Sequence, residues 1–324
     1  MDNHLISIII PAYNAELYIS HSLESCLEQT YSNIEIIVIN DGSDDNTENI
    51  VNDYVSNYSN IKLISIENSG VSTARNIGIN SSSGEYLMFL DADDILCPWA
   101  VEHLLDIILI EKADIAIGES ISTTNLLDNI SKNESIQTTV WNGTEALQKS
   151  LADHPLTYSV WAKLYRKEKI TDVFFDAKYR IHEDSLFFFM CCTKEPKVII
   201  TNEVVHQYYA SPDSASRSKF SEKKLDILLV STEKGNIIQK LYPQFNHMLY
   251  NLMIKSKMAL LNTLLSSSGY NHIEKECINY IIKYKKYFVP ATSFDKKWFF
   301  IITHHLYYIF KWYKSKKTVK LNVK

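Results

Sequence analysis

The segment FLDADDIL, residues 89–96, places three carboxylates within four positions directly after an apolar run. Asp91, Asp93 and Asp94 repel one another at neutral pH, so a folded chain tolerates them there only beside a positive group. Such oxygen ligands suit Mg2+ or Mn2+, and Mg2+ commonly takes one or two carboxylates together with substrate phosphates. The cluster therefore predicts a metal-diphosphate site. Because side chains alternate along a strand, we expect Asp91 and Asp93 to share a side and Asp94 to turn away and cap the following helix.

The acidic cluster follows one of four apolar runs in the first part of the chain. These runs are rich in β-branched or aromatic residues, as parallel strands covered on both faces should be, and they span 5–10, 34–39, 61–66 and 85–90. Helix-length amphipathic segments separate them, and one of these segments begins at a cap-like Ser43. The alternation predicts an α/β sheet with right-handed crossovers.

Polar or conformationally special residues follow each of the four runs. They are Pro11, Ala12, Tyr13 and Asn14, then Asn40, Asp41, Gly42 and Ser43, then Asn68, Ser69 and Gly70, and finally Asp91, Ala92, Asp93 and Asp94. Any one of these groups could be no more than a turn, since such residues initiate turns in most proteins. In an open α/β sheet, however, ligands bind beyond the carboxyl ends of the strands. The four groups together therefore predict one ligand-binding edge.

After residue 96 the alternation loosens. The expected elements are a helix at 98–112, a strand at 113–118, a polar surface excursion at 120–137 and mixed structure up to about residue 216. From about Phe220 onward the sequence is typical of helices, and the segment SPDSASRSKF ahead of them predicts a domain boundary. We therefore expect a domain over residues 1–217 and a helical region over 218–324.

The four strand ends resemble the nucleotide-sugar half of the family-two inverting glycosyltransferases with the GT-A fold. The stretches that carry the resemblance are SIIIPAYN, IIVINDGSDDNT, ENSGVSTARNIGI and GEYLMFLDADD, in that order along residues 5–96. A fainter similarity reaches about residue 217. The resemblance implies a nucleotide-sugar half at 1–96 and an acceptor half at 97–217. It also implies metal-dependent transfer of a hexosyl or N-acetylhexosaminyl group from a nucleoside diphosphate, with UDP the common leaving group.

The resemblance also implies which residues bind the nucleotide. The residues concerned are Pro11, Ala12, Tyr13, Asn14, Asp41 and Arg75. The first four would line the nucleobase pocket, with the Tyr13 ring against the base. Asp41 would accept a hydrogen bond from the base or the ribose, as a carboxylate can from an imide or a hydroxyl. Arg75 would lie near the base and the phosphates.

Two acidic motifs would divide the chemistry between them. In the first, Asp91 would contact the ribose or the metal, Ala92 would adjoin the donor, and Asp93 would ligate Mn2+ or Mg2+. The second motif, in YRIHEDSLFFFMCC, supplies Asp184 as the general base that inverting transfer needs and Glu183 as a ligand or orienter of the acceptor hydroxyl. The alternative for this pair is that both acids simply favour the first turn of a helix through its dipole.

Four further residues are weaker candidates for the acceptor side or for a loop over the nucleotide. Trp161 could stack on a sugar, although a buried aromatic residue is equally consistent with its context. Lys163 could contact phosphate or merely be solvated. His206 could ligate the metal, but a lone histidine is more often structural. Arg217 could contact phosphate from a closing loop.

Composition narrows the class of protein. With 324 residues and 46% hydrophobic content, the chain can bury a sizeable core. Its five cysteines form no CxxC pair and are odd in number, which predicts a reducing, cytoplasmic location. No GxGxxG follows the first strand, which argues against a nicotinamide dehydrogenase. Nucleic acid is an unpromising partner because the acidic body of the chain offers no basic face outside its end.

The end of the chain carries a different charge from the rest. From Lys283 onward, eleven lysines and one acid give +10, which leaves −15 of the total −5 for the remainder. Within 296–317, apolar and aromatic residues recur at helical spacing between lysines, namely Trp298, Ile302, Leu306, Ile309 and Tyr313. This segment is too short to span a bilayer but fits a helix that lies on an anionic membrane. The alternative is a terminal helix that docks on the protein itself or on a second subunit.

Together these expectations describe an enzyme on the inner face of the cell membrane. Its acceptor would be a growing glycan or a lipid-linked oligosaccharide in the biosynthesis of a surface polysaccharide, a step that rests on family association. The alternative function is a non-catalytic nucleotide-sugar-binding or assembly subunit, which would need no general base.

Overall fold

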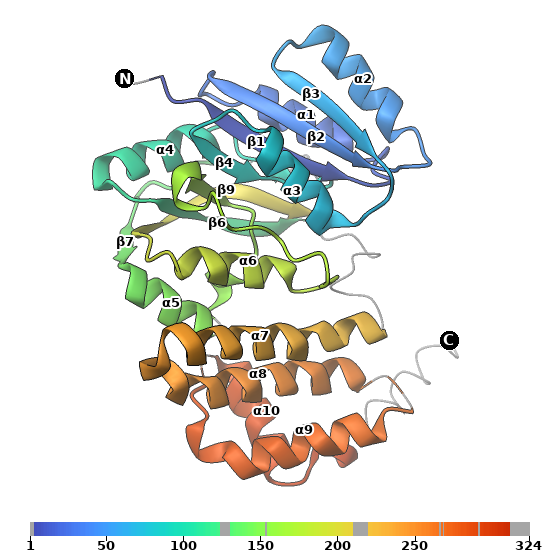
Figure 1. Ribbon diagram of the computed structural model, residues 1–324, viewed down its shortest axis with the longest axis vertical. Coiled ribbons are helices and arrows are strands. Elements are labelled where there is room, and N and C mark those ends of the chain that lie inside the picture. Colours follow the sequence, from blue (N-terminus) through green and yellow to red (C-terminus); the bar gives the residue numbers. More distant parts are fainter. Residues whose placement is uncertain are drawn as a thin grey trace. The chain divides into compact units, whose positions relative to one another are not determined.

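The computed structural model describes residues 3–123, 130–152, 154–209, 220–265, 267, 269–290 and 292–311. The chain divides into two compact units, whose elements are labelled in Figure 1. The first unit comprises Met1–Leu147 and Leu156–Pro212, and the second comprises Gln148–Pro155 and Asp213–Lys324.

In the described part of the chain, nine strands form one sheet. They are β1 (Ile6–Ala12), β2 (Ile34–Asp41), β3 (Ile61–Ile66), β4 (Tyr86–Phe89), β5 (Ile95–Leu96), β6 (Ile115–Thr123), β7 (Thr138–Trp141), β8 (Lys163–Arg166) and β9 (Val198–Tyr209). The strand order is β3-β2-β1-β4-β8-β6-β9-β5, and β7 pairs with β9. Strands β3, β2, β1 and β4 are mutually parallel, whereas β8 is antiparallel to both β4 and β6. The carboxyl ends of the four parallel strands therefore meet at one edge.

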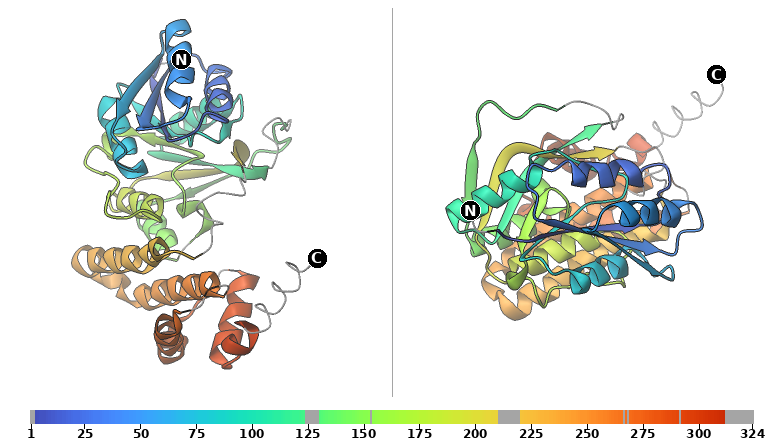
Figure 2. Two further views of the ribbon diagram at one scale, coloured as in Figure 1. Left: turned by 90° about the vertical axis from the view of Figure 1, so that its right-hand side faces the viewer. Right: turned by 90° about the horizontal axis from the view of Figure 1, so that it is seen from above.

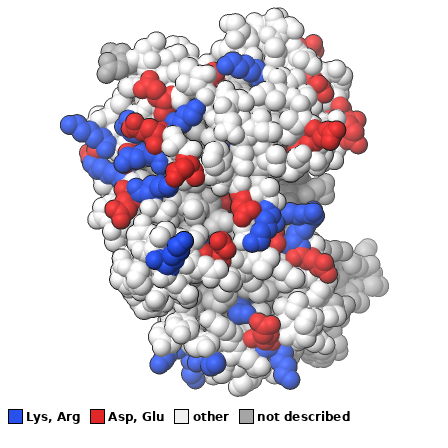
Figure 3. Space-filling view, in the orientation of Figure 1, with Lys and Arg blue, Asp and Glu red and all other residues white. Residues whose placement is uncertain are grey.

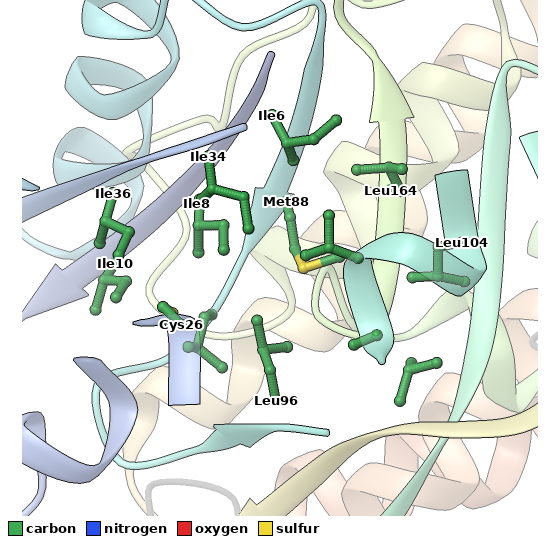
Figure 4. Close-up of a cluster of buried hydrophobic side chains, with 14 of the residues drawn as sticks. Ile6, Ile8, Ile10, Cys26, Ile34, Ile36, Met88, Leu96, Leu104 and Leu164 are labelled. Carbon is green, nitrogen blue, oxygen red and sulfur yellow. The ribbon is translucent and has the colours of Figure 1, made fainter. Parts of the chain in front are cut away.

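Helices cover both faces of the sheet around β1, β2 and β4, which are buried along their whole length, whereas the edge strand β3 is partly exposed. The helices between the strands are α1 (Ile19–Leu27), α2 (Thr47–Asn57), α3 (Val71–Ser81), α4 (Ala100–Glu111), α5 (Gly143–Leu151) and α6 (Glu183–Cys192). Helices α1, α2 and α4 contribute to the core with Ile8, and α3 packs on the other face with Ile37. Figure 4 shows Ile8, Ile10 and Ile36 of neighbouring strands near Cys26 of α1.

The predicted α/β class is confirmed, but three local expectations were wrong. Helix α2 begins at Thr47 rather than at Ser43, whose hydroxyl instead accepts a hydrogen bond from Asn14 N at 3.0 Å. Asp94 caps no helix, because α4 begins at Ala100 without a side-chain cap. The polar stretch that starts at residue 120 is strand as far as Thr123, since β6 continues to pair with β9. Main-chain pairing outweighed the polar character of that segment.

The second unit is helical in its described residues, as predicted for the end of the chain. Its α-helices are α7 (Asp226–Leu241), α8 (Asn246–Leu264), α9 (Asn271–Tyr284) and α10 (Ser293–Thr303), and α7 and α8 run side by side (Figure 2). Single 3-10 turns occur at Glu222–Leu225, Pro243–Phe245 and Lys285–Tyr287 in this unit and at Pro155–Thr157 and Lys167–Lys169 earlier in the chain. The core of the unit joins Ile254 and Leu261 of α8 to Ile281 of α9 and Ile302 of α10.

The predicted apolar stripe of the terminal segment does not lie on one continuous helix. Trp298 and Ile302 are buried in the core of the second unit, with 4% and 0% exposure. Helix α10 ends at Thr303, and His305 takes a left-handed φ of 60°. Leu306 and Ile309 follow this break and are exposed, while Tyr313 lies outside the described residues. Only the later part of the stripe is therefore accessible.

Basic and acidic side chains are interspersed on the face drawn in Figure 3. Ion pairs such as Lys197 with Glu111 (3.4 Å) bring opposite charges together. Within the described ranges, no helix is both long enough and apolar enough to cross a bilayer. None of the five cysteines forms a disulfide, and all five are buried.

Candidate active site

The end of β2 positions the loop between β3 and α3. Asp41 is buried there, and its two carboxylate oxygens accept hydrogen bonds from Ser69 N at 2.7 Å and Gly70 N at 2.9 Å. Gly70 adopts a φ of 88°, which a residue without a side chain takes at little cost, and α3 begins directly after it. Asp41 therefore fixes the start of the helix that carries Arg75. Its predicted contact with a base or a ribose stays a prediction.

The loops after β1 and β2 are tied together beside Asp41. Asn14 takes a left-handed φ of 49°. Its main-chain N–H donates a hydrogen bond to Ser43 Oγ, and its side-chain oxygen accepts one from Asp44 N at 3.0 Å. Residues 11–12 form the buried end of β1, whereas the Tyr13 side chain is 53% exposed at the same strand end. The structure thus leaves the Tyr13 ring accessible to a flat ligand, as stacking on a nucleobase would require.

A buried arginine joins the two acidic motifs. Arg75 of α3 is 3% exposed, and its Nη2 donates to Asp91 Oδ1 at 2.8 Å. Its Nη1 donates to Glu183 Oε1 at 3.0 Å and to Asp184 Oδ1 at 2.5 Å, and the ring of Phe175 lies 5.2 Å from its guanidinium carbon. Three carboxylates from two segments that are far apart in the sequence therefore meet at one cation. The sequence placed Arg75 near the donor but did not predict this role.

Burial and charge act against each other in this cluster. Burial by itself would lower the pKa of Arg75. The negative charges of Asp184, Asp91 and Glu183 together outweigh this effect and raise the pKa, so the guanidinium stays protonated. Burial raises the pKa of Asp184 well above its usual range; Arg75 partly offsets this rise, and Glu183 and Asp91 add to it. A carboxylate whose pKa is raised is a better proton acceptor than an ordinary aspartate. Both acids also occupy the first turn of α6, where the helix dipole favours them whatever their function.

Asp93 carries charge that the described protein does not neutralise. Burial, reinforced by Asp94 and Asp91, raises the pKa of Asp93 to about 7. No described side chain donates a hydrogen bond to Asp93, and no group of three His, Cys, Asp or Glu side chains among the described residues could hold a metal by itself. Asp91 is nearby and 31% exposed. This donor set fits a hard divalent cation that takes its remaining oxygen ligands from a substrate.

The side chain of Asp94 is buried and contacts residues of β9. Its carboxylate accepts from Tyr209 N at 2.8 Å and lies 3.1 Å from His206 Nε2, with both side chains fully buried. The other ring nitrogen of His206 lies 2.9 Å from Ser120 Oγ, and Trp161 stacks on the imidazole at 4.7 Å between ring centroids. His206 and Trp161 thus belong to one packed group with Asp94. The roles of His206 as a metal ligand and of Trp161 as an acceptor platform stay predictions.

Lys163 is buried instead of solvated. Its ammonium donates to Ser159 O at 2.8 Å and lies 3.2 Å from Ser159 Oγ and 3.4 Å from Trp161 O. Burial lowers the pKa of Lys163 to about 7, with a smaller opposing effect from Asp184. Lys163 therefore fastens the segment that carries Trp161. A contact with phosphate, which the sequence suggested, stays a prediction.

Sequence reasoning missed a serine that supports the acidic loop. Ser22 of α1 is fully buried, and its hydroxyl donates to Asp94 O at 2.6 Å and lies 2.9 Å from Ala92 O. Nothing in the sequence distinguishes Ser22 from other serines on amphipathic helices. Arg217 lies outside the described residues, so the structure does not place it.

Comparison with known proteins identifies a family that this chain resembles. The family model "Glycosyl transferase family 2" matches residues 7–174. The glycosyltransferase GlyA of Streptococcus pneumoniae is 32% identical over 270 residues, which is 78% of this chain and 38% of GlyA. The minor teichoic acid biosynthesis protein GgaB of Bacillus subtilis is 25% identical over 307 residues, which is 86% of this chain and 33% of GgaB. The chain thus spans well under half the length of these two curated relatives.

Solved structures share the fold. The crystal structure of S. aureus TarS 1-349 in complex with UDP-GlcNAc has a TM-score of 0.68 at 16% identity, covering 98% of this chain and 92% of that one. The mannosyltransferase PcManGT from Pyrobaculum calidifontis in complex with GDP-Man and Mn2+ has a TM-score of 0.58 at 14% identity, covering 96% and 87%. These similarities confirm the predicted GT-A fold with its additional C-terminal helices. By the family match and its similarity to GlyA, the chain belongs to glycosyl transferase family 2.

Proposed function

We propose that the chain is an inverting glycosyltransferase that moves a sugar from a nucleoside-diphosphate donor, most simply a UDP-sugar, to a hydroxyl group of a glycan. The observation that carries the proposal is the contact of Arg75 with Asp91 on one side and with Glu183 and Asp184 on the other. This contact brings a donor-binding motif and a candidate base to a single guanidinium. In this account residues 1–96 bind the donor and residues 97–217 bind the acceptor.

Asp184 is the proposed general base. Its carboxylate takes the proton of the acceptor hydroxyl while that oxygen forms a bond to the anomeric carbon. The bond between the anomeric carbon and the diphosphate oxygen breaks, and its electron pair leaves with the diphosphate. Attack from the opposite face inverts the anomeric centre. Because Arg75 holds Asp184 and Glu183 in one orientation, Glu183 is placed to accept a hydrogen bond from a neighbouring hydroxyl of the acceptor and so to orient the attacking one.

Asp93 and Asp91 are the proposed ligands of Mn2+ or Mg2+. When bound, the cation would supply positive charge against the departing diphosphate, which a glycosidase provides with a protonated acid. The carboxylate of Asp93, which has no described cationic partner and a pKa raised to about 7, supports this assignment. The Mn2+ named with PcManGT, a protein of similar fold, is consistent with it.

The nucleotide would bind along the ends of β1 and β2. Tyr13 offers an exposed ring to the base, and Asn14 fixes the loop beside it. Asp41 already accepts two main-chain hydrogen bonds, but its lone pairs can accept one more from a base or a ribose. Pro11 and Ala12 would form the buried wall of this pocket.

The acceptor is proposed to be a surface polysaccharide or its lipid-linked precursor. The name of GgaB, a minor teichoic acid biosynthesis protein, supports a role in the biosynthesis of such a polymer. Exposed Phe300, Leu306 and Ile309, followed in sequence by six lysines after residue 310, would bind an anionic membrane at its cytoplasmic face. A second copy of the chain is the competing partner for this surface.

Turnover assays test the proposed base. The full chain is incubated with Mn2+, a panel of UDP-sugars and lipid-linked acceptors, and released UDP is measured. We expect Asp184→Asn to lower turnover by about 10²- to 10⁴-fold, the usual contribution of a general base. The matched control is Asp53→Asn, an exposed acid on α2 that should leave the rate unchanged. Undiminished turnover in a folded Asp184→Asn protein would refute the assignment, and donor binding without turnover would favour the non-catalytic subunit.

A further inference from the structure

We propose that the second unit carries a binding pocket for an uncharged carbohydrate between α7 and α8. The pocket has a volume of about 380 Å3, at the lower end of the range of roughly 300–1,000 Å3 that small-molecule sites occupy. Among the described residues that line it, there is no lysine, arginine, aspartate, glutamate or histidine. Its wall consists of hydroxyl, amide, aromatic and aliphatic groups, so the pocket suits a neutral ligand of one or two sugar rings.

A glycine within α7 keeps this pocket open. Gly235 occupies the interior of the helix, where glycine is less favourable than alanine by about 1 kcal/mol. Close packing does not require a glycine here, because the nearest atom to an added Cβ would be Leu249 Cδ1 at 4.0 Å. Gly235 is also one of the residues that line the pocket. The effect of the missing side chain is therefore to leave space between the two helices.

Three amides supply the polar wall. Asn236 and Gln239 of α7 and Asn246 of α8 line the pocket, and all three are exposed. In the part of the chain that the structure describes, none of their side chains is engaged in a hydrogen bond with another residue. Each amide combines donors and an acceptor, which matches neighbouring hydroxyl groups on a sugar, since each hydroxyl also both donates and accepts. A ligand would replace water at these amides without breaking hydrogen bonds within the described protein.

Tyrosine rings supply the apolar wall. Tyr250 of α8 and Tyr280 of α9 line the pocket together with Leu249 and Met253. Tyr250 is held by stacking on both Tyr284 and Tyr287, with 4.8 Å and 4.5 Å between ring centroids. Aromatic side chains fixed in this way offer a rigid apolar surface at low entropic cost, and the C–H groups of a sugar ring are complementary to such a surface.

The pocket would serve the acceptor chain. Binding of an earlier segment of a glycan to the second unit would raise the effective concentration of its growing end at the transferase site. This role rests on the proposed transfer to a glycan, but binding of sugar to the pocket does not. A binding measurement without turnover therefore separates failure of this inference from failure of the proposed function.

The test is binding of the full chain to an array of neutral oligosaccharides with glucose, galactose, mannose, rhamnose, N-acetylglucosamine and N-acetylgalactosamine units. It is followed by saturation-transfer NMR on those that bind. Gly235→Leu fills the pocket with a residue that a helix favours, so we expect it to abolish the signal while the protein stays folded. Asn236→Ala should weaken binding about three- to tenfold, as the loss of one hydrogen bond predicts. Gln244→Ala, which removes an exposed amide that does not line the pocket, is the matched control and should change nothing.

Saturating UDP with Mn2+ distinguishes the pocket from the transferase site. Sugar binding that persists under saturation and in Asp93→Asn, yet disappears in Gly235→Leu, would support the proposal. If no glycan on the array gives a signal that depends on Gly235, the proposal is wrong. It is equally wrong if Asp93→Asn abolishes all binding, because the sugars would then occupy the transferase site.

Discussion

At the scale of single residues, the site depends on Arg75. One guanidinium is shared by three carboxylates in a nearly water-free position, and its Nε has no hydrogen-bond partner among the described residues. Removal of one partner from a buried ion pair leaves the other charges unpaired, which typically costs about 3–5 kcal/mol. The geometry of Asp91 relative to Asp184 therefore depends on a residue that need not touch the reacting atoms.

We expect Arg75→Met to lower the free energy of unfolding by about 3–5 kcal/mol at pH 7. The loss of stability should be smaller at pH 5. Burial already raises the pKa of Asp184, and removal of Arg75 raises it further. At pH 5 the carboxyl of the variant can therefore take up a proton at little cost, which removes the unpaired charge. Urea denaturation at both pH values measures the effect. Arg166→Met, which removes a partly exposed arginine near Asp114, should cost less than about 1 kcal/mol. A similar small loss for Arg75→Met would contradict its role.

Lys163 makes stability depend on pH over a higher pH interval. Its folded pKa of about 7 lies below the unfolded value near 10.4, so the unfolded state binds more protons between these values. The contribution of Lys163 to stability therefore grows as pH rises from 7 to 10 and is lost as pH falls toward 7. We expect the wild type to gain stability relative to Lys163→Met over this interval, as measured by urea denaturation. A constant difference between the two proteins would show that Lys163 stays charged.

Residue types in the sequence indicated candidate site residues but not the contacts that these residues make. The acidic motifs at Asp91 and Asp184 were recognisable because their spacing and strand-end context carry the signal. Arg75 was expected near phosphates, whereas its carboxylate partners depend on how α3 packs beside α6, which no local pattern encodes. Likewise, the burial of His206 against Asp94 follows from the pairing of β5 with β9.

At the scale of elements, apolar runs predicted the strands well because both faces of the parallel strands are covered. Helix starts were less predictable: Ser43 and Asp94 have the residue types of caps, but loop contacts with Asn14 and Tyr209 use their oxygens instead. Side-chain oxygens serve whichever main-chain amide the tertiary structure brings close. A cap-forming residue type therefore indicates a candidate and not a boundary.

Helix α7 offers a direct test at this scale. Gly235→Ala should raise the free energy of unfolding by about 0.5–1 kcal/mol, because alanine restricts the unfolded chain and the nearest atom leaves room for a methyl group. Thermal or urea denaturation of the full chain measures the change. Gly70→Ala is the contrasting variant: its φ of 88° is unfavourable for alanine, so that protein should lose stability. Destabilisation by Gly235→Ala would show that its surroundings are more crowded than the structure indicates.

At the scale of the whole molecule, the sequence predicted a helical second part but not its core. Trp298 and Ile302 belong to the same apparent stripe as Leu306 and Ile309, yet the first two are buried and the last two exposed. Periodicity alone does not distinguish residues that face a protein core from residues that face a membrane. The break at His305 separates the two groups.

The exposed residues Leu306 and Ile309 should bind anionic vesicles. We expect the full chain to sediment with vesicles that contain phosphatidylglycerol, and Ile309→Asp to reduce this binding because it places a negative charge on the apolar surface. Binding should also weaken as salt concentration rises. Leu229→Asp, at an exposed apolar position of α7, is the matched control. Equal vesicle binding by wild type and Ile309→Asp would exclude this surface and favour contact with a second subunit.

The most direct test of the account is calorimetric titration of the full chain with UDP, GDP and dTDP, each with Mn2+ and with EDTA. The account predicts that one nucleotide binds, that chelation weakens its binding, and that Asp93→Asn does the same, while Asp53→Asn binds like the wild type. If nucleotide binding is unchanged both by chelation and by Asp93→Asn, the assignment of Asp93 as a metal ligand is contradicted. Absence of binding by any of the three nucleotides to folded protein would contradict the proposed donor site itself.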